Sequence, residues 1–288
     1  MNYDPKTDKF PYPEDTDKHY LHVKKDDGTV FDKNYPYVDT SKKMLRKQKW
    51  TRVLLNLLVF PLSYIRMGLR VKGKENLKKY KDVIDKGVVS ICNHVHMWDY
   101  IGIMNGVKQH KTYLLAWDKN VSGENGKMIR SVGGIPIPSG DLEATHAYLK
   151  AVKNLLQGGG WLHLYPEGSM WEYYAPIRPF KRGAAYLACE NDKPVLPLAY
   201  SYRKPNWFRR VIFRQIALFT LHIGEPIFPD NSLSRTDREL DLTKRMHAAV
   251  CELAGIDPKE NQYKPIHTHD KRVDYYTTIY GVGYKGSM

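Results

Sequence analysis

Short apolar runs alternate with segments of helical periodicity through most of this chain, and this alternation leaves few possible folds. Runs with the length of buried strands occur at residues 88–92, 112–116, 161–165, 194–200 and 216–223. Helices are predicted between and after them, at residues 99–107, 126–132, 141–156, 182–190 and 236–253. Strands separated by helices favour a parallel sheet with helices on its faces. We therefore predict an α/β fold: a single domain with a central mixed, largely parallel sheet flanked by helices.

Composition divides the chain into four segments. Residues 1–41 are polar and without periodicity, and are predicted to form a tail. Residues 42–80 form a basic amphipathic segment, residues 81–256 the α/β domain, and residues 257–288 a polar, Tyr-rich tail. The three cysteines show no CxxC spacing, which argues against a disulfide framework or a structural zinc site and indicates a reducing compartment. The N-terminus lacks the apolar region of a secretory signal.

Positive charge is concentrated in residues 42–81. Thirteen Lys and Arg against one acid, Glu75, account for +12 of the formal net charge of +14. The apolar stretch at residues 53–65 spans about 20 Å as a helix, short of the ~30 Å hydrocarbon core, and Pro61 interrupts it. We predict an interfacial helical segment that contacts anionic lipids, not nucleic acid, because its centre is apolar. A buried core helix with solvated ends is the alternative.

The first predicted strand runs into ICNHVHMWDY at residues 91–100. His94 and Asp99 would diverge by about 140° on a helix and point to opposite faces of a strand. The chain must therefore turn if they meet, with His94 in the loop and Asp99 at the next helix start. A carboxylate on one imidazole nitrogen leaves the other as a base, which suits removal of a proton from a hydroxyl that attacks an acyl carbonyl. An ordinary hydrogen-bonded turn is the alternative.

The same stretch also permits a metal hypothesis, through His94, His96 and Asp99. The HxHxDH pattern of binuclear metallohydrolases, however, requires Asp at 98 and His at 99, where this chain has Trp98 and Asp99. Further ligands would come from the C-terminal tail, at His267, His269 and Asp270. A polar tail is a poor scaffold for a metal site, so we expect no metal. His96 is then not part of the predicted pair of His94 and Asp99.

A second polar break follows the strand predicted at residues 161–165. Pro166 ends the strand, Glu167 offers a carboxylate, and Gly168 lets a ligand approach the backbone. Lys181 and Arg182 then open a helix, and cations beside exposed helix N–H groups suit a phosphate. A capped loop is the alternative interpretation.

Taken in order, these blocks resemble the motifs of the glycerolipid acyltransferase family, of the lysophosphatidic acid acyltransferase type. NHVHMWD at residues 93–99 is similar to its NHx4D motif, and YPEGS at residues 165–169 to its FPEGT block. Three further stretches resemble its glycine–aliphatic, PFKxGA and V-x-P-V motifs: GIPI at 134–137, PFKRGA at 179–184 and VLPL at 195–198. The resemblance covers about residues 50–225.

The resemblance implies acyl transfer from acyl-CoA or acyl carrier protein to a hydroxyl of a lysophospholipid or related lipid, as in phospholipid biosynthesis, without a cofactor. His94 would be the general base and Asp99 would orient it. The residues expected to bind substrate are Asn93, Glu167, Gly168, Ser169, Lys181, Arg182 and Arg130. The resemblance also implies a peripheral or monotopic enzyme on the cytoplasmic face of a membrane, because acceptor and product lie in the bilayer.

Two departures from the family pattern concern the acceptor. The family's third block continues with an Arg that holds the acceptor phosphate, and here Met170 follows Ser169. The middle block usually ends in a basic residue, and here Pro138 follows. Cations that could replace these contacts are Arg130, Arg178, Lys181 and Arg182. Otherwise the acceptor is a neutral or glycosylated lipid or another lysophospholipid. A metal-dependent ester hydrolase and a non-catalytic lipid-binding protein remain as alternative functions.

Overall fold

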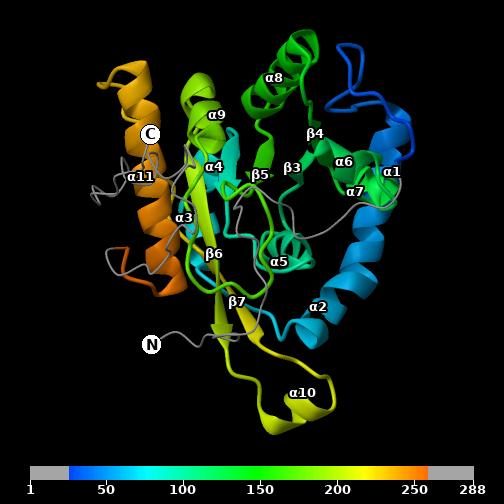
Figure 1. The fold of residues 1–288 in the computed structure, drawn as a ribbon, viewed down its shortest axis with the longest axis vertical. Helices are drawn as coiled ribbons and strands as arrows, with labels where there is room; N and C mark the ends of the chain where they lie inside the picture. The colour runs from blue at the N-terminus through cyan, green and yellow to red at the C-terminus, as the bar shows by residue number, and fades with distance from the viewer. Residues whose placement is uncertain (1–25, 259–288) are drawn as a thin grey trace, which may run out of the picture.

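A seven-stranded sheet organises the computed structural model, which describes residues 26–258 (Figure 1). The strands are β1 Arg70–Lys72, β2 Val88–Ile91, β3 Thr112–Trp117, β4 Gly134–Ile137, β5 Trp161–Leu164, β6 Val195–Arg203 and β7 Leu218–Ile223. They lie in the order β1-β7-β6-β2-β5-β3-β4, and neighbours run parallel except β6 with β7. The predicted mixed, largely parallel sheet is confirmed.

Helices flank this sheet, as predicted for parallel strands. They include α3 Lys74–Lys79, α4 Lys81–Ile84, α5 Asp99–Gly106, α6 Asp118–Ser122, α7 Gly126–Ser131, α8 Leu142–Gln157, α9 Gly183–Asn191, α10 Trp207–Val211 and α11 Arg235–Ala254. Residues of α8, α9 and α11 form one apolar cluster with Val89 and Ile91, and residues of α5 form a second with Val88. Because successive strand residues point to opposite faces, β2 is buried on both sides.

Residues 42–66 of the basic N-terminal segment form one continuous helix. α1 Lys42–Leu54, the π-helical turn η1 Leu55–Val59 and α2 Phe60–Arg66 follow directly on one another. Pro61 lies in the first turn of α2 and does not end the helix. The residue before it, Phe60, follows the wider π turn, and its N–H donates to the Leu55 carbonyl there. In Figure 1 this helix runs down the right of the molecule. No helix within residues 26–258 is long and apolar enough to cross a bilayer.

Both flanks of this helix are tied to the domain. β1, at the end of the segment predicted to contact a membrane, pairs with β7 at the sheet edge. Residues 26–41 form no helix or strand, but Tyr37 is buried with its ring centroid 5.8 Å from that of Tyr148 on α8. The remainder of the predicted N-terminal tail and residues 259–288 of the C-terminal tail lie outside the described residues.

β2 and β5 place the two polar breaks of the sequence next to each other. The strands are adjacent and parallel, with Ile91 in register with Leu164. Their carboxyl ends therefore lie at the same edge of the sheet, which is where α/β folds place their ligand sites.

Candidate active site

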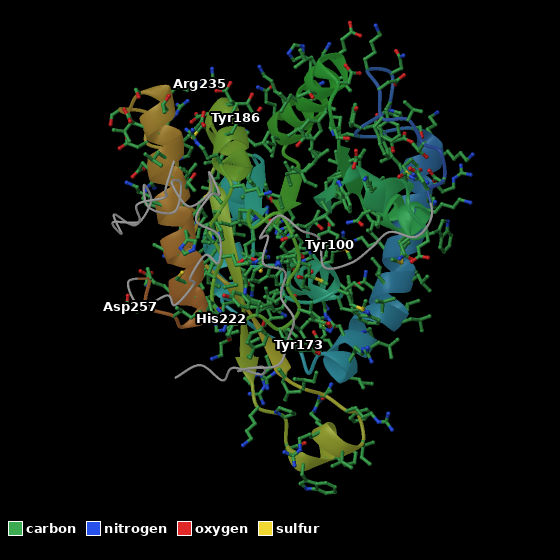
Figure 2. All side chains as sticks on the ribbon, viewed as in Figure 1. Tyr100, Tyr173, Tyr186, His222, Arg235 and Asp257 are labelled. Atoms are coloured by element: carbon green, nitrogen blue, oxygen red, sulfur yellow. The ribbon has the colours of Figure 1, made fainter. Side chains whose placement is uncertain are left out.

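The loops after β2 and β5 are joined by main-chain hydrogen bonds. The N–H groups of Trp171 and Tyr173 donate to the carbonyls of His94 and Val95, at 3.0 and 2.8 Å (Tyr173 is labelled in Figure 2). The N–H of His94 donates to Glu167 Oε2 at 3.0 Å. The two polar blocks predicted from the sequence therefore form one structure around His94.

His94 and Asp99 meet as the predicted turn requires. His94 Nδ1 lies 2.7 Å from Asp99 Oδ2, at the first residue of α5, and the N–H of Val95 donates to the same oxygen at 3.1 Å. The other oxygen accepts from the Tyr165 hydroxyl at 2.6 Å. Burial acts to raise the pKa of Asp99, but the charge of His94 and the hydrogen bonds from His94 and Tyr165 outweigh it and hold this pKa below the usual value. Asp99 is therefore a carboxylate at neutral pH.

This arrangement leaves Nε2 of His94 as the basic nitrogen. A carboxylate at Nδ1 holds the proton there, so the lone pair of the neutral ring is on Nε2. The ring of Tyr165 stacks on that of His94, with centroids 3.9 Å apart and planes 9° from parallel. The His94 side chain is 25% exposed, whereas that of Asp99 is 2% exposed, so a substrate can reach the imidazole but not its carboxylate partner.

Glu167 is held by a buried arginine. Its carboxylate accepts from the main-chain N–H of Arg178 and from Arg178 Nη2, both at 2.9 Å. Arg178 Nη1 donates to Ser169 Oγ at 2.8 Å, and Nη2 also donates to the Ser169 carbonyl. Arg178 is only 2% exposed, so its guanidinium is occupied inside the protein and is not placed to replace the missing phosphate-binding Arg. Glu167 and Ser169 are also buried, which gives them a part in shaping the loop around His94.

Lys181 lies against the backbone of Gly168. Gly168 has φ +80°, a conformation that favours glycine, and an added Cβ would come within 2.8 Å of Lys181 Nζ. The Lys181 N–H donates to the Pro166 carbonyl at 2.8 Å, which fixes this close approach. Lys181, an exposed residue, is thus a cation that the structure places beside the turn after β5.

The other residues predicted to bind substrate lie at different distances from His94. Asn93 is buried beside the pair, where its amide bonds both main-chain groups of Tyr200, at 2.8 and 3.1 Å. Arg182 lies next to Lys181, but its guanidinium faces Glu239 of α11 at 3.3 Å. Arg130 binds Asp27 and the Val121 carbonyl, and α7 leads into the amino end of β4, away from the carboxyl end of β2. The structure therefore does not bring Arg130 together with the others.

His96 has a structural environment. Its Nδ1 accepts from the Trp98 N–H at 3.0 Å, and burial lowers its pKa to about 4, so the ring is neutral near pH 7. Among residues 26–258, no group of three or more His, Cys, Asp or Glu side chains is arranged to hold a metal ion. The tail residues of the metal hypothesis, His267, His269 and Asp270, lie outside the described residues.

Two tyrosines at the site have no role predicted from the sequence. The sequence does mark Tyr165, because it has a hydroxyl at a position where the family's motif has Phe. Tyr200 donates its hydroxyl to the main-chain carbonyl of Asp99 at 2.6 Å, and it is 101 residues away in the chain. No local pattern predicts such a contact, because it depends on β2 pairing with β6.

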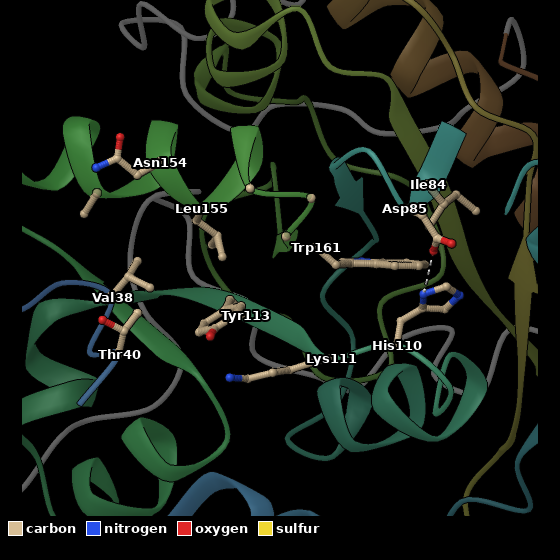
Figure 3. Close-up of a pocket in the computed structure, with 14 residues that line it drawn as sticks. Val38, Thr40, Ile84, Asp85, His110, Lys111, Tyr113, Asn154, Leu155 and Trp161 are labelled. Carbon is tan, nitrogen blue, oxygen red and sulfur yellow. Dashed lines mark ion pairs between the residues drawn. The ribbon is translucent and has the colours of Figure 1, made fainter. Parts of the chain in front are cut away.

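A pocket of about 640 Å³ lies at the other end of the sheet (Figure 3). Its lining comes from segments that enter β2, β3 and β5, including Asp85, His110 and Trp161. Figure 3 marks the ion pair of His110 with Asp85, whose atoms are 3.8 Å apart. The pocket is therefore separate from His94 at the carboxyl ends of these strands.

Comparison with known proteins finds a family model and a solved structure that resemble this chain. Residues 68–201 match the family model described as Acyltransferase, and this range includes His94, Asp99 and Glu167. A similar solved structure is that of the 1-acyl-sn-glycerophosphate (LPA) acyltransferase PlsC from Thermotoga maritima. It is 18% identical over 74% of this chain and 84% of that chain, with a TM-score of 0.48. Through residues 68–201, this chain is therefore similar to the acyltransferase family.

Proposed function

We propose that this protein transfers a fatty acyl group from a thioester, acyl-CoA or acyl carrier protein, to a hydroxyl of a lysophospholipid or related lipid. The observation that carries the proposal is the 2.7 Å contact of His94 Nδ1 with Asp99 Oδ2, inside the segment matched to the acyltransferase family. Such a contact turns the partly exposed imidazole into an oriented general base.

In the proposed reaction His94 Nε2 takes the proton of the acceptor hydroxyl while the oxygen attacks the thioester carbonyl carbon. Asp99 stabilises the imidazolium that forms. Collapse of the tetrahedral intermediate breaks the carbon–sulfur bond, and the imidazolium returns its proton to the leaving thiolate. The products are the new ester and the free thiol, and no acyl group becomes attached to the protein.

Lys181 is the proposed contact for a phosphate of the acceptor or donor. Its amine lies over Gly168, whose lack of a side chain leaves room for the lysine beside the turn after β5. We assign phosphate binding to Lys181 because of this position beside the turn. Arg182 is next to it, and its guanidinium faces Glu239.

Membrane association is proposed for the helix from α1 to α2. Its exposed apolar side chains are Leu45, Trp50, Val53, Leu54, Leu57, Leu58, Leu62 and Ile65. Such a row beside a local excess of Lys and Arg suits the interface of an anionic membrane, where a lipid acceptor would be met. A peripheral or monotopic position on the cytoplasmic face follows from this proposal.

The test is acyl transfer by the purified full chain, with acyl-CoA or acyl carrier protein and a panel of lipid acceptors, read by mass spectrometry of the products. His94→Ala should lower the rate by about 10²–10⁴-fold, the usual effect of removing a general base. His146→Ala, an exposed histidine on α8, is the matched control and should behave as wild type. Equal rates for His94→Ala and wild type would contradict the mechanism.

The same assay separates the alternative functions. A metal-dependent ester hydrolase would release free fatty acid and lose activity with chelator. A non-catalytic lipid-binding protein would bind vesicles and form no product with either donor.

A further inference from the structure

The connection between β6 and β7 carries an exposed apolar cluster. This α10 loop, residues 204–217, extends beyond the end of the sheet at the bottom of Figure 1. Its exposed side chains are Trp207, Phe208, Val211, Ile212, Phe213 and Ile216, and α10 itself has no buried residue. Trp207 is 71% exposed. Apolar side chains gathered on a protruding loop mark a surface that another phase or molecule covers.

The cluster is built on a defined structure. The ring of Phe208 lies 6.0 Å from that of Trp207 and 5.7 Å from that of Phe213, both edge-on. Asn206 caps α10 by accepting from the Arg209 N–H at 2.9 Å. The aromatic rings therefore contact one another on a short helix that is held at its start.

Hydrogen bonds attach the loop to the end of the N-terminal helix. Arg209 Nη1 donates to Gln215 Oε1 at 3.1 Å, which closes the loop on itself. Gln215 Nε2 donates to the Arg66 carbonyl at 2.9 Å and to the Ile65 carbonyl. The α10 loop therefore lies beside the end of α2, where Leu62 and Ile65 are also exposed.

The charge of the loop selects the kind of partner. Residues 204–217 contain four basic side chains and no acid: Lys204, Arg209, Arg210 and Arg214. Tryptophan and phenylalanine interleaved with arginine match the boundary of an anionic bilayer, where rings enter the acyl region and guanidinium groups bind headgroup phosphates.

The position of the loop relates it to the active site. The α10 loop leaves the carboxyl end of β6, which is parallel to β2, and His94 follows the carboxyl end of β2. Met97, three residues beyond His94, is also exposed. The loop, the end of α2 and the reacting pair thus share one end of the molecule.

We propose that the α10 loop is a second membrane-docking element, which inserts its aromatic cluster into an anionic bilayer and turns the His94 end of the sheet toward the lipid. This role is additional to that of the N-terminal helix. It does not depend on acyl transfer, because docking is a property of the surface alone.

The test is co-sedimentation of the full chain with vesicles of phosphatidylcholine and phosphatidylglycerol, without donor or acceptor. Trp207→Ser/Phe208→Ser/Ile212→Ser should lower the vesicle partition coefficient about tenfold or more, since it removes three anchors at the interface. The matched control is Met128→Ser/Leu142→Ser/Phe228→Ser, three exposed apolar residues elsewhere, which should bind as wild type. Equal binding of the loop variant and wild type overturns the proposal.

Depth and stoichiometry provide independent readouts. Lipids brominated on the acyl chain should quench the fluorescence of Trp207 and of Trp50 on the N-terminal helix, and Trp207→Phe should reduce the quenched fraction. Unchanged quenching in Trp207→Phe would contradict insertion of this loop. Sedimentation velocity without lipid should give the same oligomeric state for wild type and the triple variant. A smaller oligomer in the triple variant than in wild type would instead identify a second copy of the chain as the partner that covers this surface.

Discussion

At the scale of single residues, Tyr165 connects the two halves of the site. Its ring stacks on His94 and its hydroxyl donates to the Asp99 oxygen that His94 does not contact. Burial and the Asp99 charge both raise the pKa of Tyr165 well above its usual value, so the phenol remains a donor. It thus holds the His94 imidazole and the Asp99 carboxylate together.

Tyr165→Phe should keep the stacking and remove the hydrogen bond. We expect kcat for acyl transfer to fall about tenfold, because one hydrogen bond to a charged group is lost. KM should change little. Steady-state kinetics checks this split. Tyr165→Leu, which also removes the stacking, should lower kcat further. A Tyr165→Phe enzyme with wild-type kcat would show that the hydroxyl has no positioning role.

Arg178 and Arg182 allow a comparison of a buried with an exposed ion pair. Arg178→Met leaves the Glu167 carboxylate buried without its guanidinium, and the free energy of unfolding should fall by about 3–5 kcal/mol. Arg182→Met removes a pair whose arginine side chain is 46% exposed, and should cost less than about 1 kcal/mol. Urea unfolding measures both values. Similar losses for the two variants would be inconsistent with a structural role for Arg178.

At the scale of elements, the helix from α1 to α2 combines a polar capped start with an apolar end. Its first residues are basic and follow the Ser41 cap, whereas the exposed side chains around η1 are leucines. Phe60 and Ser63 face inward, and the Ser63 hydroxyl accepts from Asn105 of α5 at 3.1 Å. One side of the helix is thus fixed to the domain while the leucines face outward.

Replacing Leu54, Leu57 and Leu58 with Ser should weaken binding to anionic vesicles about tenfold or more, because these side chains would enter the interface. Binding of wild type should also weaken as salt rises, since the basic residues act through screened attraction. Co-sedimentation across a salt series measures both effects. Salt-independent binding that is unchanged by the substitutions would exclude an interfacial role for this helix.

At the scale of the whole molecule, three buried histidines make stability depend on pH. Burial lowers the pKa of His96 to about 4 and those of His163 and His247 to about 3. Below pH 6.5 the unfolded chain binds protons at these rings that the folded protein does not. The free energy of unfolding should therefore fall as the pH drops from 6.5 toward 4.

Each such histidine contributes a slope of about 1.4 kcal/mol per pH unit within that window. His163→Gln should reduce the slope by about that amount, whatever its effect on stability at pH 7. Chemical unfolding at pH 7, 6 and 5 provides the measurement. A slope that His163→Gln leaves unaltered would mean that this ring is not the neutral group described.

Much of the fold and part of the site could be predicted from local patterns. Strand-length runs separated by helices predict the α/β sheet because burial on both faces requires continuous apolar residues. His94 and Asp99 are five residues apart, so one turn is enough to join them. The ordered motifs resemble those of the acyltransferase family, whose model matches residues 68–201. The roles of the remaining predicted residues stay predictions.

Local sequence patterns therefore predict the elements, their order and the pair within one turn, because these depend on residues that are neighbours along the chain. The folded structure sets which distant groups meet, because those contacts depend on strand order. It joined Tyr200 to Asp99 and committed Arg178 to Glu167. It also placed the apolar residues of the α10 loop on the surface. Hydropathy gives the affinity of a side chain for an apolar phase, but the packing of the whole chain decides whether protein or another phase covers it.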